Sequence, residues 1–219
     1  ILCGACAKAC PEDAILFEAP KKGDKADLSL YKDVWVFCEQ RHGELEEVAL
    51  ELLGEGRKLA DLRDSRLCGI ILGKNTAAIA QKVLENGADR AIVIDSPALE
   101  NFRDDTYADA MYRLIEKYRP EIVLAGATAY GRSFIPRVAA MLRTGLTADC
   151  TALSIDPSGN LMQTRPAFGG NIMATILCTR KRPQMATVRS GVMKKPEPCS
   201  ASRGVVINEK ISGGEISSL

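Results

Sequence analysis

The sequence has few of the features that mark a membrane protein or a partner of nucleic acid. Lysine and arginine (29) nearly equal aspartate and glutamate (28), so the net charge of +1 gives no general attraction to a polyanion. No apolar run approaches the length that spans a bilayer, and the first residues do not have the pattern of a signal peptide. We therefore expect a cytoplasmic protein with no nucleic-acid partner and no membrane span.

Residues for side-chain catalysis are equally scarce. The single histidine, His42, follows an expected strand end, where a solvated turn histidine is a more common finding than a catalytic one. No carboxylate pair, Cys–His dyad or Ser–His–Asp set is recognisable. Neither a Walker loop nor a GxGxxG phrase occurs. We expect no bond-making chemistry by the side chains of this chain.

Three of the eight cysteines lie within the first ten residues, as Cys3, Cys6 and Cys10 followed by Pro11. This C-x2-C-x3-C-P spacing matches the last three cysteines of the bacterial ferredoxin run and predicts ligands of a 4Fe-4S cluster. Zinc is the alternative, but no distant second cysteine pair completes such a site. The ligand set is incomplete, so this chain alone need not hold a cluster. Because the run opens in mid-motif, we expect a piece of a longer protein.

The other five cysteines occur singly, which argues against a disulfide framework and for a reducing compartment. We expect four of them to be buried and Cys199 to lie in an exposed polar loop. The four are Cys38, Cys68, Cys150 and Cys178.

From residue 33 the chain alternates between short apolar strands and amphipathic helices, which is typical of a parallel sheet covered on both faces. The expected strands are 34–39, 68–73, 89–95 and 121–125, and the expected helices cover about 45–60, 76–85 and 105–118, with a fourth after the turn that ends at Gly131. The fold class is therefore α/β, with a Rossmann-like parallel sheet, a flanking antiparallel portion and a partial ferredoxin-like module in front. Ligands of such sheets bind at the carboxyl ends of the strands.

The stretch from Leu124 to Cys150 is the clearest candidate site. A buried strand leads into a turn of small residues, Gly126 to Gly131, and then into a helix whose start carries Arg132. A helix N-terminus with free N–H groups favours an anion. Ser133 is expected to cap this helix, and Pro136 to be tolerated in its first turn. An ordinary strand–turn–helix with solvated arginines is the competing interpretation.

Beyond Cys150 the pattern changes to strands at 151–155, 161–164, 172–179 and 184–188, which we expect to be antiparallel. Gly169 and Gly170 predict either a bulge or a close backbone approach to a ligand. A further strand begins at Gly204.

Residues 33–198 resemble the N-terminal domain of electron-transfer flavoprotein alpha subunits. The phrases that carry the resemblance are VWVFCEQ, LAGATAYGRSFIPRVAAMLRTGLTADCT, TRPAFGGNIMATI and TVRSGVMKKPEP, in the order of the family. A ferredoxin-like module in front is similar to the longer alpha subunits of anaerobes, which are associated with flavin-based electron bifurcation.

The resemblance implies a domain plan and a function. Residues 1–20 correspond to the partial ferredoxin-like module, 21–32 to a linker, and 199–219 to the start of a connection to a C-terminal FAD domain. The family passes electrons between a donor, the flavins of an alpha–beta heterodimer and an acyl-CoA dehydrogenase-type partner. NADH as donor and ferredoxin as acceptor belong to the bifurcating members. Such a chain is an electron-carrier subunit rather than a stand-alone enzyme.

By the same resemblance, two segments face the beta subunit or a flavin. The cofactor-binding candidates are Gly126, Thr128, Gly131, Arg132, Arg165, Gly169, Gly170 and Asn171. Arg132 and Arg165 suit a flavin anion or a phosphate, because arginine stays charged and forks onto oxyanions. Intersubunit or structural ion pairs are the alternative for both. A different class of function, an adenine-nucleotide-binding α/β module with an iron–sulfur sensor, also remains open.

Overall fold

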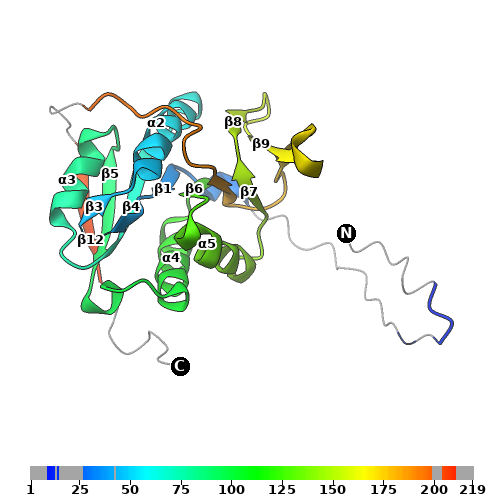
Figure 1. The fold of residues 1–219 in the computed structure, drawn as a ribbon, viewed down its shortest axis with the longest axis horizontal. Helices are drawn as coiled ribbons and strands as arrows, with labels where there is room; N and C mark the ends of the chain where they lie inside the picture. Colours follow the sequence, from blue (N-terminus) through cyan, green and yellow to red (C-terminus); the bar gives the residue numbers. More distant parts are fainter. Residues whose placement is uncertain (1–8, 13, 15–26, 42, 199–203, 211–219) are drawn as a thin grey trace.

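A parallel sheet with the strand order β12-β5-β4-β1-β6-β11-β7 forms the centre of the structure (Figure 1). This computed structural model describes residues 9–12, 14, 27–41, 43–198 and 204–210. All neighbouring strands of the sheet run parallel. The strands are β1 (Val34–Phe37), β4 (Leu67–Gly73), β5 (Arg90–Asp95), β6 (Ile122–Gly126), β7 (Leu146–Cys150), β11 (Gln184–Val188) and β12 (Val205–Glu209).

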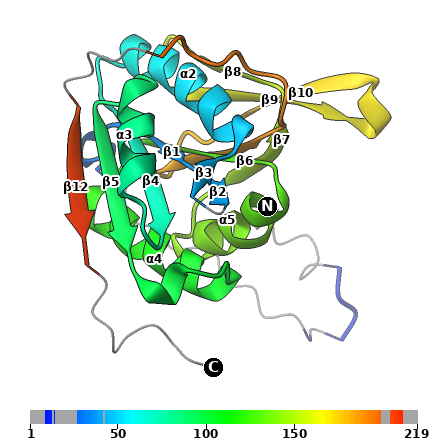
Figure 2. The same cartoon turned by 60° about the vertical axis from the view of Figure 1, so that its left-hand side comes forward.

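Helices cover both faces of this sheet, which confirms the predicted α/β class (Figure 2). One face packs against α2 (Glu47–Leu62) and α3 (Ala77–Glu85), and the other against α4 (Asp104–Tyr118) and α5 (Ala129–Met141). Short 3-10 turns, η1 (Leu28–Leu30) and η2 (Pro97–Leu99), and a small hairpin of β2 (Gln40–Arg41) and β3 (Glu44–Leu45) complete this part.

The central strand β1 shows why these apolar runs form buried strands. Its alternate residues point to opposite faces, so Val34 and Val36 join the cluster under α2 and α3, whereas Trp35 and Phe37 join the cluster under α4 and α5. All four are buried. A strand apolar at every position is stable only between two helical layers.

A separate antiparallel sheet projects from the edge of the domain (Figure 2). It contains β8 (Ala152–Ile155), β9 (Leu161–Ala167) and β10 (Ile172–Leu177), in the order β10-β9-β8. The antiparallel strands predicted at 151–155, 161–164 and 172–179 are thus confirmed. We call the β9–β10 hairpin, residues 161–177, the arm.

The direction predicted for residues 184–188 is wrong. They form β11, which lies between β6 and β7 and runs parallel to both. All five residues of β11 are buried. After the three antiparallel strands, the chain re-enters the main sheet at the edge where its other strands begin. Residues 184–188 therefore run in the same direction as their neighbours and are buried between them. Residues 146–150 form the edge strand β7 beside β11.

Two local predictions about α5 are also wrong. The N-cap is Thr128, whose side chain accepts a hydrogen bond from the Gly131 N–H, and Ser133 lies inside the helix. Pro136 also lies well inside α5 rather than in its first turn. The helix begins earlier than expected because Thr128 directly follows the strand and has the extended backbone of a capping residue.

The strand predicted to begin at Gly204 is confirmed as β12. It pairs in parallel with β5 at the edge of the sheet opposite β7. Glu209 holds it there, because its carboxylate accepts hydrogen bonds from the Lys117 ammonium and the Tyr118 hydroxyl of α4. Residues 205–209, expected as part of a connection, therefore also belong to the main sheet.

Candidate site at the carboxyl edge of the sheet

The turn between β6 and α5 is tightly built. A Cβ on Gly131 would lie 1.9 Å from the carbonyl oxygen of Gly126, and a Cβ on Gly126 would press on Val48 of α2 at 2.8 Å. The small residues picked out in the sequence thus serve backbone packing directly. The Gly131 N–H that a bound anion would use is engaged by Thr128 Oγ1 at 3.1 Å.

A buried carboxylate lies behind this turn, at the point where the strand order reverses. β1 and β6 are neighbours, yet β4 and β5 intervene between them in the sequence, which makes their carboxyl ends the switch point of the sheet. Glu39, 1% exposed, follows β1 and accepts a hydrogen bond from the Thr128 hydroxyl. Arg41 Nη2 donates to its other oxygen at 3.1 Å. A negative charge at this position disfavours a phosphate beside the start of α5.

Aromatic rings cover the same switch point. Tyr130 stacks on Phe102 with ring centroids 3.8 Å apart, and the Arg41 guanidinium lies over the Tyr130 ring at 4.7 Å. Phe102 in turn meets Phe134 of α5 edge-on. These side chains lie where open α/β sheets commonly bind a nucleotide.

Three arginines surround one carboxylate beside the turn. Asp149, in β7, accepts two hydrogen bonds from Arg189, at 3.2 Å and 2.7 Å, and one from Arg132 at 3.4 Å. The hydrogen bonds from Arg189 hold the pKa of Asp149 below its usual range, against the opposing effect of burial, and the charges of Arg132 and Arg165 act in the same direction. Arg132 Nε also donates to the Ala127 carbonyl at 2.7 Å.

The predicted segment from Arg165 to Asn171 has one end beside Asp149 and the other end at the tip of the arm. Arg165 lies in β9, near Asp149, whereas Gly169, Gly170 and Asn171 lie at or beside η3 (Phe168–Gly170), the tip of the arm. Phe168 and both glycines have positive φ, so the glycines supply a hairpin turn and not a bulge. The structure brings Gly126, Thr128, Gly131, Arg132 and Arg165 to one edge, and leaves the arm tip apart from them.

The arm exposes large apolar side chains on both of its faces. Phe168 is 85% exposed, and Ile172, Met173, Ile176 and Leu177 of β10 are exposed as well. Successive strand residues point to opposite faces, so consecutive exposed residues such as Ile172 and Met173 leave neither face covered. Exposed apolar patches of this kind are typical of surfaces that contact another protein, a membrane or a ligand.

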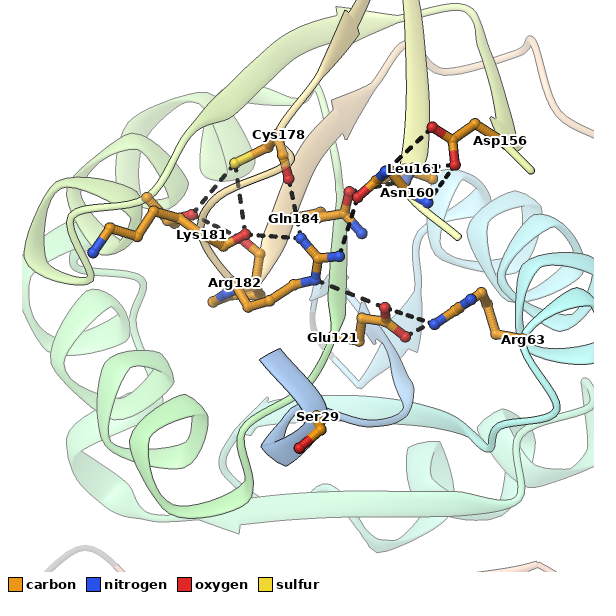
Figure 3. Close-up of polar contacts among 12 residues, drawn as sticks. Ser29, Arg63, Glu121, Asp156, Asn160, Leu161, Cys178, Lys181, Arg182 and Gln184 are labelled. Carbon is orange, nitrogen blue, oxygen red and sulfur yellow. Dashed lines mark hydrogen bonds and ion pairs between the residues drawn. The ribbon is translucent and has the colours of Figure 1, made fainter. Parts of the chain in front are cut away.

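A buried arginine ties the arm to the main sheet (Figure 3). Arg182 Nη1 donates to the carbonyls of Cys178 and Lys181, and Nη2 donates to Asn160 Oδ1 at 3.3 Å. Its Nε lies 3.7 Å from Glu121, which directly precedes β6 and is also paired with Arg63, the residue that follows α2. One guanidinium thus joins the segment after β10, the turn before β9 and the core.

Three of the four cysteines expected to be buried are buried. They are Cys38, Cys68 and Cys150, and burial raises the pKa of their thiols to about 12, about 12 and about 11. They pack as small apolar side chains. Cys178, just after the edge strand β10, is only half-buried. Of the expected cluster ligands, Cys10 is described and is partly buried, whereas Cys3 and Cys6 lie outside the described residues. His42, expected in a solvated turn, and Cys199, expected in an exposed loop, also lie outside them.

Two other kinds of site can be checked against the described part of the chain. Within it, no group of three or more His, Cys, Asp and Glu residues is placed to hold a metal ion. None of its helices combines the length and apolar character needed to cross a membrane. The side chains whose chemistry suits a metal are the thiols of the N-terminal cysteine motif, which match the ligands of an iron–sulfur cluster.

Sequence reasoning missed Glu39, Asp149, Arg189 and the apolar residues of the arm. Glu39 carried a weak signal, since a carboxylate directly after a buried strand lies at the ligand-binding edge. The arm carried another, because apolar residues at consecutive positions of an edge strand cannot all face a core. Asp149 had no local signal, because its partners are 17 and 40 residues away in sequence.

Comparison with known proteins agrees with this arrangement. The family model for the electron transfer flavoprotein domain matches residues 34–212, and that for the 4Fe-4S binding domain matches residues 1–16. The electron transfer flavoprotein subunit alpha of Thermoanaerobacterium thermosaccharolyticum is 53% identical over 165 residues, which cover 75% of this chain and 50% of that protein.

Two further relatives have names that describe complexes. The acryloyl-CoA reductase electron transfer subunit beta of Anaerotignum propionicum is 47% identical, covering 80% of this chain and 54% of that protein. The lactate dehydrogenase (NAD(+),ferredoxin) subunit LctC of Acetobacterium woodii is 41% identical, covering 90% and 47%. The chain spans about half the length of the relatives it matches. It belongs to the electron transfer flavoprotein family and is similar to its alpha subunits.

Proposed function

We propose that this chain is the front part of an electron-carrying alpha subunit, which passes electrons through flavins held in a heterodimer with a beta subunit. The observation that carries the proposal is the match of residues 34–212 to the electron transfer flavoprotein domain, with a 4Fe-4S match directly in front. In such a subunit the cofactors supply the redox chemistry, and the protein positions them.

The domain plan is part of this proposal. Residues 1–20 form a partial ferredoxin-like module, 21–32 a linker, 33–198 the family's N-terminal domain, and 199–219 the start of a connection to an FAD domain. The cytoplasm is the proposed location, supported by single cysteines that are buried as free thiols at Cys38, Cys68 and Cys150.

The arm is the proposed surface for pairing with the beta subunit. Its exposed apolar residues on both faces require cover from a partner, and the cofactor candidates Gly169, Gly170 and Asn171 lie at its tip. Gly126, Thr128, Gly131, Arg132 and Arg165 lie together at the sheet edge beside its base. We propose that this edge faces the subunit interface and its flavin.

The cluster ligands in this proposal are Cys3, Cys6 and Cys10, which either share one 4Fe-4S cluster or, as in two-cluster ferredoxins, divide between two, with Cys10 on the second. A 4Fe-4S cluster would add one-electron transfer beside the flavins. This addition supports bifurcation, with NADH as donor, ferredoxin as one acceptor and an acyl-CoA dehydrogenase-type protein as another. The names of two relatives contain ferredoxin and acryloyl-CoA reductase, which fits such a pair of acceptors.

The test is a cofactor analysis of the complete protein, purified without oxygen together with its co-purifying subunit. Iron, sulfide, flavin and adenine nucleotide are quantified, and visible spectra are recorded before and after NADH. Iron and sulfide with two FAD per heterodimer, bleached by NADH, is the expected result. One FAD with AMP would keep electron transfer and remove bifurcation. Bound adenine nucleotide without iron or flavin would overturn the proposal and favour a nucleotide-binding module.

A further inference from the structure

The group of Asp149 with Arg132, Arg165 and Arg189, which we call the arginine cluster, has more positive charge than its carboxylate neutralises. The fork of Arg189 occupies both oxygens of Asp149, and Arg132 reaches only one of them, at 3.4 Å. The one side-chain hydrogen bond of Arg165 to the described chain is a long contact from Nε to the neighbouring Pro166 carbonyl. Three guanidinium groups therefore share one carboxylate, which leaves a local charge of about +2.

The backbone at Asp149 sets the direction of its side chain. The pairing of β7 with β11 is irregular at this point, and Asp149 has a φ of 62°. Its N–H donates to the Thr187 hydroxyl at 3.1 Å. Irregularities of this kind re-aim a side chain at the end of a strand. Here the carboxylate meets arginines from α5 and from the end of β11, and so holds two guanidinium groups in place on one surface.

The cluster remains accessible and adjoins the arm. The side chains of Arg132 and Arg189 are 61% and 48% exposed. Arg165 is opposite Ala174 in the pairing of β9 with β10, so it lies within the arm itself. Apolar residues beside exposed arginines are the composition of a protein interface with a charged rim.

The surroundings favour a carboxylate over a phosphate. The backbone N–H of Gly131, in the first turn of α5, already donates to the Thr128 hydroxyl. The Thr128 hydroxyl in turn donates to the buried carboxylate of Glu39. Both features weaken the start of α5 as a phosphate site. A second copy of this chain is also disfavoured, because a symmetric pairing about the arm base would bring two positive clusters together.

From this geometry we infer that Arg132, Arg165 and Arg189 form a docking site for acidic side chains of the protein partner that covers the arm. This inference rests on the proposed function, in which that partner is the beta subunit. Arginine suits the role, because its planar fork binds a carboxylate through two parallel hydrogen bonds.

The test measures the dissociation constant of the complete protein and its beta subunit at low and high salt. Arg132→Gln and Arg165→Gln should each weaken binding about three- to tenfold at low ionic strength, and the difference should shrink at about 0.5 M salt. Arg165→Lys keeps the charge without the fork and should recover part of the loss. Arg137→Gln is the matched control and should bind as the unchanged protein does, because Arg137 is an exposed residue of α5 whose side chain makes no hydrogen bond or ion pair to the described residues.

Flavin content and thermal unfolding of every variant separate the outcomes. Glutamine variants that fold and bind like Arg137→Gln would overturn the inference and leave the proposed function standing. Variants that lose flavin with unchanged subunit affinity would show a cofactor phosphate site instead. Failure of the unchanged protein to bind a beta subunit would overturn the proposed function and the inference together.

Discussion

At the scale of single residues, the turn after β6 depends on the absence of a side chain at Gly131. A Cβ there would lie 1.9 Å from the Gly126 carbonyl oxygen, so the backbone of the turn would have to move. We predict that Gly131→Ala destabilises the fold by about 3 kcal/mol, despite the gain in helix propensity of about 1 kcal/mol. Urea unfolding measures the change.

A glycine with ordinary space around it provides the control for this prediction. A Cβ on Gly145 would meet the Cys178 sulfur at 3.4 Å, which is a van der Waals contact. Gly145→Ala should therefore change the free energy of unfolding by no more than about 0.5 kcal/mol. Equal losses for the two alanine variants would contradict the argument from the close approach of Gly126.

Asp95 has a similar local role at the carboxyl end of β5. Its carboxylate accepts hydrogen bonds from the N–H groups of Asn75 and Thr76 and from the Thr76 hydroxyl, before α3. Burial opposes the charged form, but the Thr76 and Asn75 hydrogen bonds prevail and lower the pKa of Asp95 below its usual 3.8. A lowered pKa means that this stabilisation is present above the unfolded pKa and is lost as the pH falls through the folded pKa.

We predict that Asp95→Asn costs about 1 kcal/mol of unfolding free energy near pH 7, and that the difference from the unchanged protein narrows as the pH falls below the usual aspartate pKa of 3.8. Urea unfolding at several pH values measures both. Asp64→Asn is the control, because Asp64 is exposed and its side chain makes no hydrogen bond to the described residues. A pH-independent loss in Asp95→Asn would exclude the hydrogen-bonded carboxylate as its cause.

At the scale of elements, substitutions at the exposed residues of the arm should change partner binding without changing the stability of the fold. Phe168 and Met173 are exposed, at 85% and 54%, so they contribute little to the folded monomer. We predict that Phe168→Ser with Met173→Ser leaves the free energy of unfolding within about 0.5 kcal/mol and weakens beta-subunit binding by about tenfold or more. Leu62→Ser, an exposed apolar residue of α2, is the control. Unchanged affinity in the arm variant would rule out the arm as the pairing surface.

A substitution at Arg182, where the arm joins the main sheet, should instead lower the stability of the fold. Arg182 is buried and holds the carbonyls of Cys178 and Lys181, Asn160 and, through an ion pair, Glu121 (Figure 3). Removing its charge breaks these contacts, so Arg182→Met should cost about 3 kcal/mol. Hydrogen exchange should rise in β8 to β10 before it rises in β1 or β4.

Arg180→Met, a change at an exposed arginine of the same segment, is the control for the arm root and should leave both measurements unchanged. Uniform loss of protection across β1, β4 and the arm after Arg182→Met would indicate that Arg182 supports the whole core. The distinction matters for function, because only a local effect would make Arg182 a residue that positions the arm.

At the scale of the whole molecule, β12 closes one edge of the main sheet. It pairs with β5 along five residues, and Glu209 binds Lys117 and Tyr118 of α4. We predict that a chain ending at Pro198 exposes the β5 edge, lowers the cooperativity of urea unfolding and aggregates at lower concentration. Light scattering and the slope of the unfolding transition measure these effects. Val206→Thr keeps the strand and should behave as the unchanged chain.

Much of the architecture can be predicted from short stretches of the sequence. The runs at 34–37, 67–73, 90–95 and 122–126 are apolar at nearly every position, which a parallel sheet between two helical layers requires. The amphipathic faces of α2 to α5 follow from the same patterning. The spacing of Cys3, Cys6 and Cys10 predicts cluster ligands with no help from the fold. These features depend on neighbours a few residues apart, so the sequence alone determines them.

The tertiary structure decided what depends on residues far apart in the chain. Glu39 and Thr128 are 89 positions apart, and they meet only because β1 and β6 become neighbours at the switch point. Asp149 meets Arg132 and Arg189 because β7 is placed beside β11. The direction of β11 was mispredicted for the same reason, since a buried run of five residues specifies a strand but not its neighbours. Periodicity assigns each element its buried face, and packing between elements decides which side chains share a site.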